Sequence, residues 1–279
     1  MKKISRRSFL TAAAVSAAAL ALTACGGSSS SASSVASSAA ASSEAASTSA
    51  AAAELTTVEA GKLTMATNAA FPPYEMTTDA GEIEGIDVDT AKAIAEKLGL
   101  ELQIDDMDFD AALLSVQQGK ADIVMAGVTV TDERKAVMDF SDSYATGIQS
   151  IIVPEGSDIA SPDDLAGKKI GTQRGTTGYI YCSDDFGDEN VVAYDNGLTA
   201  VQALNNGQVD AVVIDNAPAK EFVAANPGLV ILDTSYAEED YAIGMAKGSS
   251  LESAINAALE ELKADGTLQS IVDKYITAE

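Results

Sequence analysis

Hydrophobic and polar residues alternate with two different periods along most of the chain, from about residue 55 to the C-terminus. Short apolar runs with the length of buried strands lie at 62–67, 101–106, 121–127, 168–173 and 210–215. Segments in which apolar residues recur with helical spacing lie at 87–99, 109–120, 197–208, 217–228, 250–266 and 268–276. Strands that alternate with helices in this way predict an α/β fold with largely parallel sheets.

Two segments of this pattern resemble one another. Residues 113–127 (LLSVQQGKADIVMAG) and 201–215 (VQALNNGQVDAVVID) each combine a helix, a glycine, an aspartate and a buried strand, at a constant offset of 88 residues. The repeat favours two lobes with a sheet each, although two ordinary helix–strand turns could match by coincidence. If the lobes face one another, the strand ends at 127–129 and Asp215 border one cleft, because ligands bind beyond the carboxyl ends of open α/β sheets.

Composition narrows the classes of function. The chain has 279 residues, with 42 acidic against 17 basic side chains and no histidine. A formal charge of −25 disfavours nucleic acid and anionic lipid as partners. Without histidine the chain lacks the commonest general base and the commonest ligand of transition metals. Residues 106–117 lack the glycine and glutamate of a calcium loop, so we expect no metal and no cofactor.

The N-terminus has the features of an export signal. A basic start (MKKISRR) precedes a short apolar stretch that ends in LTAC, at Cys25. This ending resembles the lipobox of bacterial lipoproteins, in which the cysteine is diacylglycerol-modified and the peptide is cut before it. We therefore expect a lipoprotein signal peptide at 1–24 and a lipid on Cys25. The motif SRRSFL is also similar to the twin-arginine signal, so the export route stays open.

Residues 25–57 are almost entirely serine and alanine. Such a segment buries too little apolar surface to offset the entropy of ordering it, so we expect a flexible tether.

Arginine is rare in the predicted folded region, where only Arg134 and Arg174 occur. Arg134 follows a predicted helix N-cap at Thr131, in a first turn where the helix dipole favours acids. That position suits a guanidinium that faces an anion, since its planar fork binds a carboxylate through two parallel bonds. A salt bridge to Asp132 or to another nearby acid explains the spacing equally well. Arg174 is expected at the surface or at a hinge.

Other candidate residues also have two interpretations. Thr176 and Thr177 are predicted at a helix N-terminus, where anions bind, or in a simple capped turn. The same segment has neither a P-loop nor GxGxxG, so it does not support nucleotide binding. Asp215 could pair with a ligand ammonium or cap the following helix. The aromatic residues Phe71 and Phe109 could belong to a site or to the core.

Four segments together resemble one protein family. They are GEIEGIDVDTAKAIAEKLG (81–99), GKADIVMAGVTVTDERKAVMDFSDSY (119–144), GTTG (175–178) and VDAVVIDNA (209–217). In this order, over about residues 60–277, they are similar to the bacterial extracellular solute-binding proteins, family 3, which serve ABC importers of polar amino acids. Thr90 departs from the family pattern, which usually has an apolar residue there.

The resemblance implies a two-lobed periplasmic-binding-protein fold of type II, with two sheets flanked by helices and joined by two crossover hinge strands. The crossover strands are expected at 147–153 and 241–246. Lobe 1 would comprise 58–146 and 242–279, and lobe 2 would comprise 147–241.

The resemblance also implies how a ligand is held. Arg134 would clamp the α-carboxylate of an amino acid, with amide or hydroxyl groups of Gly127, Thr129 and Thr177. Asp215 would receive the α-ammonium.

The ligand side chain would lie between Phe71 and Phe109. Asn68 stands where some binders of basic amino acids have an aspartate, whereas segments 68–75 and 215–222 look most like arginine- or lysine-type binders. The side-chain preference is therefore predicted to lean towards basic amino acids.

The sequence thus predicts a monomeric, extracytoplasmic, lipid-anchored binding protein and no enzyme. It would capture a free polar amino acid and deliver it to the permease of an ABC importer. An enzyme like the cyclohexadienyl dehydratases, which share this fold, is the first alternative, and a sensory ligand-binding domain is the second. Arg134 paired with Asp215 suits a zwitterion better than a cyclohexadienyl dicarboxylate.

Overall fold

The computed structural model of this protein describes residues 55–276. The predicted signal peptide, Cys25 and most of the predicted tether lie outside these residues. Within them, no helix combines the length and the apolar character that a membrane span requires.

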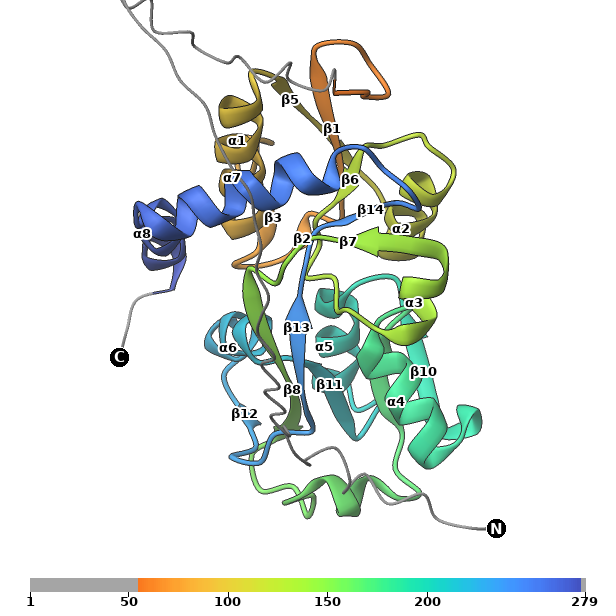
Figure 1. Cartoon of the computed structure of the whole chain (residues 1–279). Coiled ribbons are helices and arrows are strands. Elements are labelled where there is room, and N and C mark those ends of the chain that lie inside the picture. Colours follow the sequence, from red (N-terminus) through yellow and green to blue (C-terminus); the bar gives the residue numbers. More distant parts are fainter. Residues whose placement is uncertain (1–54, 277–279) are drawn as a thin grey trace, which may run out of the picture. The chain divides into compact units, whose positions relative to one another are not determined.

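The first sheet has five strands in the order β5-β1-β6-β14-β7 (Figure 1). The strands are β1 (Lys62–Thr67), β5 (Glu101–Asp106), β6 (Ile123–Val124), β7 (Met138–Phe140) and β14 (Gly244–Ala246). Strands β5, β1 and β6 are parallel, whereas β14 runs antiparallel to both of its neighbours. The accompanying helices are α1 (Ile86–Leu98), α2 (Phe109–Gln117), α3 (Asp132–Val137), α7 (Glu252–Ala264) and α8 (Thr267–Tyr275).

The second sheet has six strands, with β10-β9-β11-β8-β12 in order and β13 also paired to β8. The strands are β8 (Ala145–Pro154), β9 (Ile170–Gln173), β10 (Val191–Tyr194), β11 (Ala211–Asp215), β12 (Leu229–Ile231) and β13 (Ala237–Tyr241). Its helices are α4 (Thr177–Phe186), α5 (Gly197–Asn205), α6 (Asn216–Ala225) and the short 3₁₀ turns η1 (Pro162–Leu165) and η2 (Asp188–Asn190).

The predicted strands and helices are present, but the expectation of largely parallel sheets was wrong. Only β5-β1-β6 and β10-β9-β11 pair in parallel, and the remaining ladders of both sheets are antiparallel. The reason is that the chain passes between the sheets on strands that run against the others. A third, small sheet of β2 (Ala70–Phe71), β3 (Glu75–Thr77) and β4 (Ile83–Glu84) was also not predicted, because its strands are too short to show a period.

Two connections join the sheets. One runs from β7 into β8, and the other runs from β13 into β14. They lie side by side, since β13 pairs antiparallel with β8 and the amide of Tyr144 donates to the carbonyl of Tyr241 at 3.0 Å. The paired connections agree with the two crossovers that the resemblance implied.

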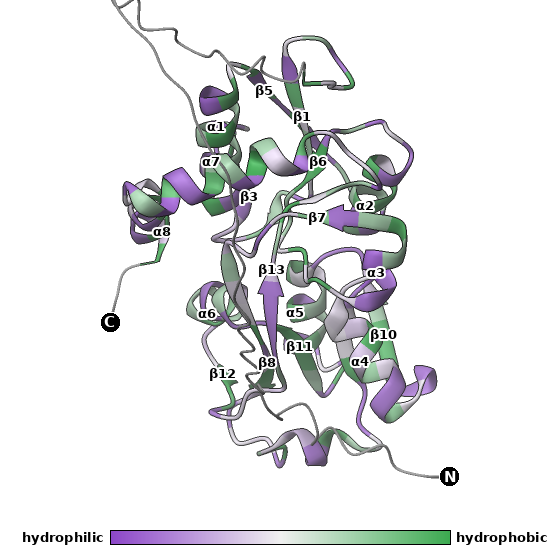
Figure 2. Ribbon diagram, in the orientation of Figure 1, coloured by the Kyte–Doolittle hydropathy of each residue, from purple (hydrophilic) through white to green (hydrophobic). Residues whose placement is uncertain are grey.

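Alternation along the strands buries both faces of the second sheet. On β8, Ile151 and Val153 belong to one cluster of buried side chains and Ile152 to another, as expected for a period of two. Figure 2 shows β8 and β11 as largely hydrophobic, whereas β13 is hydrophilic along its length. Strand β13 pairs with β8 alone among the described strands, so its exposed acids suit a sheet edge, whereas the buried Glu239 needs polar partners inside the protein.

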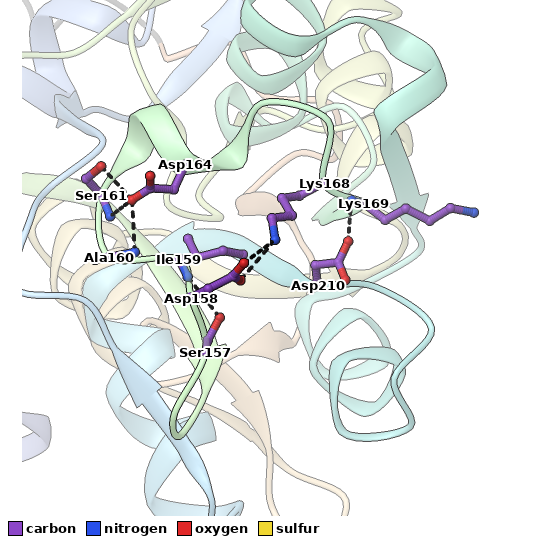
Figure 3. Close-up of polar contacts among 9 residues, drawn as sticks. All are labelled: Ser157, Asp158, Ile159, Ala160, Ser161, Asp164, Lys168, Lys169 and Asp210. Carbon is purple, nitrogen blue, oxygen red and sulfur yellow. Dashed lines mark hydrogen bonds and ion pairs between the residues drawn. The ribbon is translucent and has the colours of Figure 1, made fainter.

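The connection from β8 to β9 is held by local polar contacts at the amino ends of β9 and β11 (Figure 3). Lys168 binds the carboxylate of the exposed Asp158 at 2.9 Å, Asp164 completes a capping box with Ser161, and Asp210 accepts from the amide of Lys169 at 2.7 Å. Because this end of the sheet is occupied by turn-stabilising contacts, the opposite end, where β9 and β11 finish, is the place to look for a site.

Candidate functional site

A small cavity lies where segments of the two sheets meet. Its lining is formed by residues of both sheets and their loops, namely Asn68, Phe71, Glu75, Phe109, Ala126, Gly127, Thr129, Arg134, Gln149, Gln173, Thr176, Thr177 and Tyr241. Its volume of about 20 Å³ has room for about one water molecule. Seven of the eight ligand-site residues expected from the sequence line this cavity.

Larger hollows exist elsewhere on the described surface but lack this convergence of buried polar groups. One of about 470 Å³ is lined by Pro73, Tyr275 and the exposed pair Lys220 and Glu221. Buried polar side chains that point at one small space are a stronger indication of a binding site than volume alone.

Arg134 is positioned by the start of α3. Thr131 caps that helix, as predicted, and accepts a hydrogen bond from the amide of Arg134 at 3.2 Å. The guanidinium donates to the carbonyl of Thr129 at 2.7 Å and, on the side of the second sheet, to the carbonyl of Gly175 at 3.1 Å. These carbonyls, rather than Asp132, are its hydrogen-bond partners.

The guanidinium of Arg134 is also buried against an aromatic ring. Its central carbon lies 5.4 Å from the centre of the Phe109 ring, within the range of a cation–π contact. Burial lowers the pKa of Arg134, and the negative charge of Glu239 opposes this effect. Arg134 is the only lysine or arginine that is buried among residues 55–276.

Thr129 and Thr177 meet at a buried glutamate. Their hydroxyl oxygens are 3.4 Å apart, and both lie within hydrogen-bonding distance of Glu239 Oε2, at 3.0 and 2.9 Å. Gln149 Nε2 donates to the same oxygen at 3.0 Å. Three donors on one atom make this carboxylate the centre of the polar network at the cavity.

Gly127 and Phe71 are in close contact. Gly127 has a φ of 56°, and a Cβ on this residue would lie 2.7 Å from the Phe71 ring. Its amide donates to Asp87 Oδ2 at 3.0 Å. The position therefore requires glycine both for the left-handed backbone and for the approach of the aromatic ring.

Asn68 joins the two sheets at another point of the lining. Its amide nitrogen donates to the carbonyl of Met107 at 2.9 Å, and its oxygen accepts from Gln173 Nε2 at 2.9 Å. Both polar atoms of Asn68 are therefore occupied by the protein itself.

Asp215 is the one expected site residue whose side chain does not line the cavity. It caps α6, accepting from the amide of Ala217 at 2.9 Å, and its other oxygen accepts from the amide of Ile148 at 2.7 Å. Burial raises the pKa of Asp215 to about 6, while the two backbone donors act in the opposite direction. The cap interpretation of Asp215 is therefore confirmed, whereas its contact with a ligand ammonium stays a prediction.

Glu75 is a lining residue that sequence reasoning missed. It is fully buried beside the carboxyl group of Asp87, and no N–H or hydroxyl donor among the described residues reaches its oxygens. Burial, followed by the charge of the nearby Asp87, raises the pKa of Glu75 well above its ordinary value. A glutamate two residues after a pair of prolines gives no sign in the sequence of being buried.

Glu239, which does not line the cavity itself but accepts from lining residues, was missed as well, although its strand carries a signal. In β13 the residues alternate between exposed and buried, which turns Glu239 and Tyr241 inwards. A short acidic strand directly before the second crossover could have been recognised as functional, because acids are rarely buried without a partner.

Two further residues lie outside the cavity lining, and one of them, Arg174, was expected at the surface or at a hinge. Arg174 is half exposed, 3.8 Å from Asp195. Cys182 is a buried free thiol, and burial raises its pKa to about 12.

Comparison with known proteins agrees with this geometry. The profile of the bacterial extracellular solute-binding proteins, family 3, matches residues 63–278. The chain is 34% identical over 222 residues to a probable histidine-binding protein of Neisseria gonorrhoeae, covering 77% of this chain and 83% of that one. It is 34% identical over 228 residues to the arginine-binding extracellular protein ArtP of Bacillus subtilis (strain 168), covering 78% and 87%.

Among solved structures, the arginine-, lysine-, histidine-binding protein ArtJ from Geobacillus stearothermophilus is similar. It has a TM-score of 0.75 and 35% identity, and the match covers 78% of this chain and 96% of that one. The architecture is that of the type II periplasmic binding proteins, so the predicted fold class is confirmed. The cavity between two sheets, the two crossovers and the matched residues lead to one conclusion: the chain belongs to the bacterial extracellular solute-binding proteins, family 3.

Proposed function

We propose that this protein captures a free polar L-amino acid, with a preference for a cationic side chain, and delivers it to the permease of an ABC importer. The observation that carries the proposal is the buried guanidinium of Arg134 in a cavity whose lining threonines, Thr129 and Thr177, bind the buried carboxylate of Glu239. A guanidinium binds a ligand carboxylate, and unpartnered acids call for ligand cations.

The acids of the site support the cationic preference. Glu239 Oε1 is buried and has no hydrogen-bond partner among the described atoms. The raised pKa of Glu75 keeps that acid protonated, so Glu239 is the acid that a ligand cation would meet. A ligand with a second positive charge would pair with it, and the named relatives bind arginine, lysine or histidine.

Each residue of the proposed site is assigned one contact with the bound amino acid. Arg134 would bind the α-carboxylate, helped by Gly127, Thr129 and Thr177. Phe71 and Phe109 would enclose the side chain, with Asn68 at its polar end. Asp215 would receive the α-ammonium, since each of its oxygens accepts from one backbone amide and keeps a further acceptor site.

Binding requires the cavity to open. A volume of about 20 Å³ is far too small for an amino acid. We propose that lobe 1 (58–146 and 242–279) and lobe 2 (147–241) separate about the paired crossovers, admit the ligand and close around it. Hydrogen bonds such as Asn68–Gln173 and Arg134–Gly175 would form again on closure.

The cellular setting is part of the same proposal. A lipid on Cys25 and the Ser/Ala-rich tether would hold a monomeric binding domain at the outer face of the cell membrane, where the permease takes the ligand from the closed form. No catalytic role is proposed, because the family and the named relatives are binding proteins.

A thermal-shift screen of the twenty amino acids tests the function. L-Arginine and L-lysine are expected to raise the melting temperature most, since a ligand that binds only the folded state stabilises it. L-Glutamine, which lacks the second charge, should give a smaller shift. If no amino acid shifts the transition, or if prephenate or arogenate is turned over, the proposal is wrong.

A further inference from the structure

Glu239 has an unusual position for a buried acid. It lies on β13, the hydrophilic strand of Figure 2, two residues before the crossover begins to leave the second sheet, and pairs in register with Gly147. Its side chain is only 7% exposed. The exposed neighbour Glu238 points the other way, as the strand period requires.

Glu239 accepts hydrogen bonds from residues in different parts of the fold. Thr177 starts α4 beside the second sheet, and Gln149 belongs to β8 of that sheet. Thr129 follows β6 of the first sheet and bridges to Tyr241 at the crossover. Since each hydroxyl has a single proton and gives it to Glu239 Oε2, the two threonines are oriented by this one oxygen.

The second carboxylate oxygen of Glu239, Oε1, has no such donors within residues 55–276. Oε1 is buried and has no hydrogen-bond partner among the described atoms. The charge of Glu239 acts on Arg134, but no ion pair within 4 Å joins these two residues in the part of the chain that the structure describes. Closing the site therefore buries an acceptor that the protein leaves unsatisfied, which opposes closure.

We propose that Glu239 is a positioning residue that couples closure of the cavity to the arrival of a cationic group of the ligand. Oε2 orients the Thr129 and Thr177 hydroxyls, and Oε1 accepts a hydrogen bond from the ligand cation. The inference rests on the proposed function, because it assumes an amino acid as ligand.

The two oxygens then make closure conditional. If the lobes separate, Thr129 and Thr177 move apart, and Oε2 can keep a hydrogen bond to only one of them. Closure therefore gains the second of these hydrogen bonds. Without a ligand this gain is opposed by the buried, unpartnered Oε1. With a ligand cation in place the opposition is removed, and the ligand shifts the equilibrium through a contact that it makes only in the closed form.

Glu239→Gln tests this coupling, with Glu238→Gln as the matched control on the same strand. The amide can still accept from a threonine, but its NH₂ group cannot accept from a cation. Calorimetry with L-arginine should show affinity about 10- to 100-fold weaker for Glu239→Gln and unchanged for Glu238→Gln. Stopped-flow measurements should show that the affinity is lost because L-arginine dissociates faster from Glu239→Gln. The ligand-free melting temperature should not fall, which separates positioning from damage to the fold.

Small-angle scattering provides the second readout. Saturating L-arginine should contract the wild type, and Glu239→Gln should need correspondingly more L-arginine for the same contraction. Thr177→Val, which removes one donor and keeps the volume, should also weaken binding.

Wild-type affinity and wild-type dissociation in Glu239→Gln would refute the coupling while leaving the proposed function intact. If the wild-type protein binds none of the twenty amino acids, the proposed function fails, and this inference fails with it.

Discussion

Arg134 is the residue on which the proposed carboxylate site depends, and the surrounding backbone and one aromatic ring hold its side chain in place. Its two terminal nitrogens donate to carbonyls on opposite sides of the cavity, and the Phe109 ring covers its face. Burial disfavours its charge, and the negative Glu239 nearby compensates in part. A lysine at this position would have one nitrogen where the arginine has a planar fork.

We expect Arg134→Lys to lower the affinity for L-arginine at least about 100-fold, because the paired hydrogen bonds to the ligand carboxylate cannot be copied. Isothermal titration calorimetry measures the effect. Arg174→Lys is the matched control, since Arg174 is half exposed and lies outside the cavity, and it should bind like the wild type. Equal affinity in both variants would remove Arg134 from the site.

At the scale of secondary-structure elements, the buried acid Asp87 lies where helix α1, the loop after β6 and the small sheet meet. Asp87, in the first turn of α1, is fully buried and accepts from the amide of Gly127, in the loop that follows β6. Glu75 of the small sheet lies nearby, and its own pKa is raised. Burial raises the pKa of Asp87 from 3.8 to about 6, against the effect of its hydrogen bonds.

The raised pKa of Asp87 makes the free energy of unfolding fall as the pH rises. The folded state holds the proton of Asp87 more tightly than the unfolded state does, so Asp87 costs stability as the pH rises from about 4 to about 6. Asp87→Asn, which can still accept from Gly127, should therefore match the wild type near pH 4. Above pH 6 it should be more stable, by on the order of 3 kcal/mol at most. Urea unfolding across this range measures the difference.

Glu96→Gln, an exposed substitution on the same helix, is the control for this experiment and should show a pH-independent difference near zero. A constant offset between Asp87→Asn and the wild type across the range would contradict the assignment.

At the scale of the whole molecule, the proposed location of the binding domain depends on the charge and on the N-terminal segment. A formal charge of −25 repels an anionic membrane surface, so attachment to a membrane would need another source. The diacylglycerol that we propose on the cysteine after LTA would supply one and would anchor the domain through the tether.

Cys25→Ala should release the protein from the membrane fraction of its cells into the soluble extracytoplasmic fraction. Immunoblotting of the two fractions measures this, and calorimetry should show unchanged affinity for L-arginine, because the substitution lies far from the cavity residues in sequence. A variant that stays with the membrane would show that Cys25 is not the anchor.

Local periodicity in the sequence was sufficient to predict much of the fold. The strands at 62–67 and 101–106 have the predicted bounds, and α1 differs from its predicted range by one residue at each end. The cap at Thr131 was also correct, because capping depends on neighbouring residues alone. The direction of β8, β13 and β14 was not predictable, since strand length and pattern do not encode orientation.

The sequence by itself determined the α/β class, the two-lobe repeat and the rare arginine that became the centre of the site. Only the tertiary structure decided that Asp215 faces backbone amides and that Glu239, 110 residues from Thr129, collects the donors around the cavity. The physical reason is the separation along the sequence of the residues that interact. Helix, strand and cap propensities arise from residues a few positions apart, whereas a buried carboxylate is defined by donors that the folded chain brings together from remote positions.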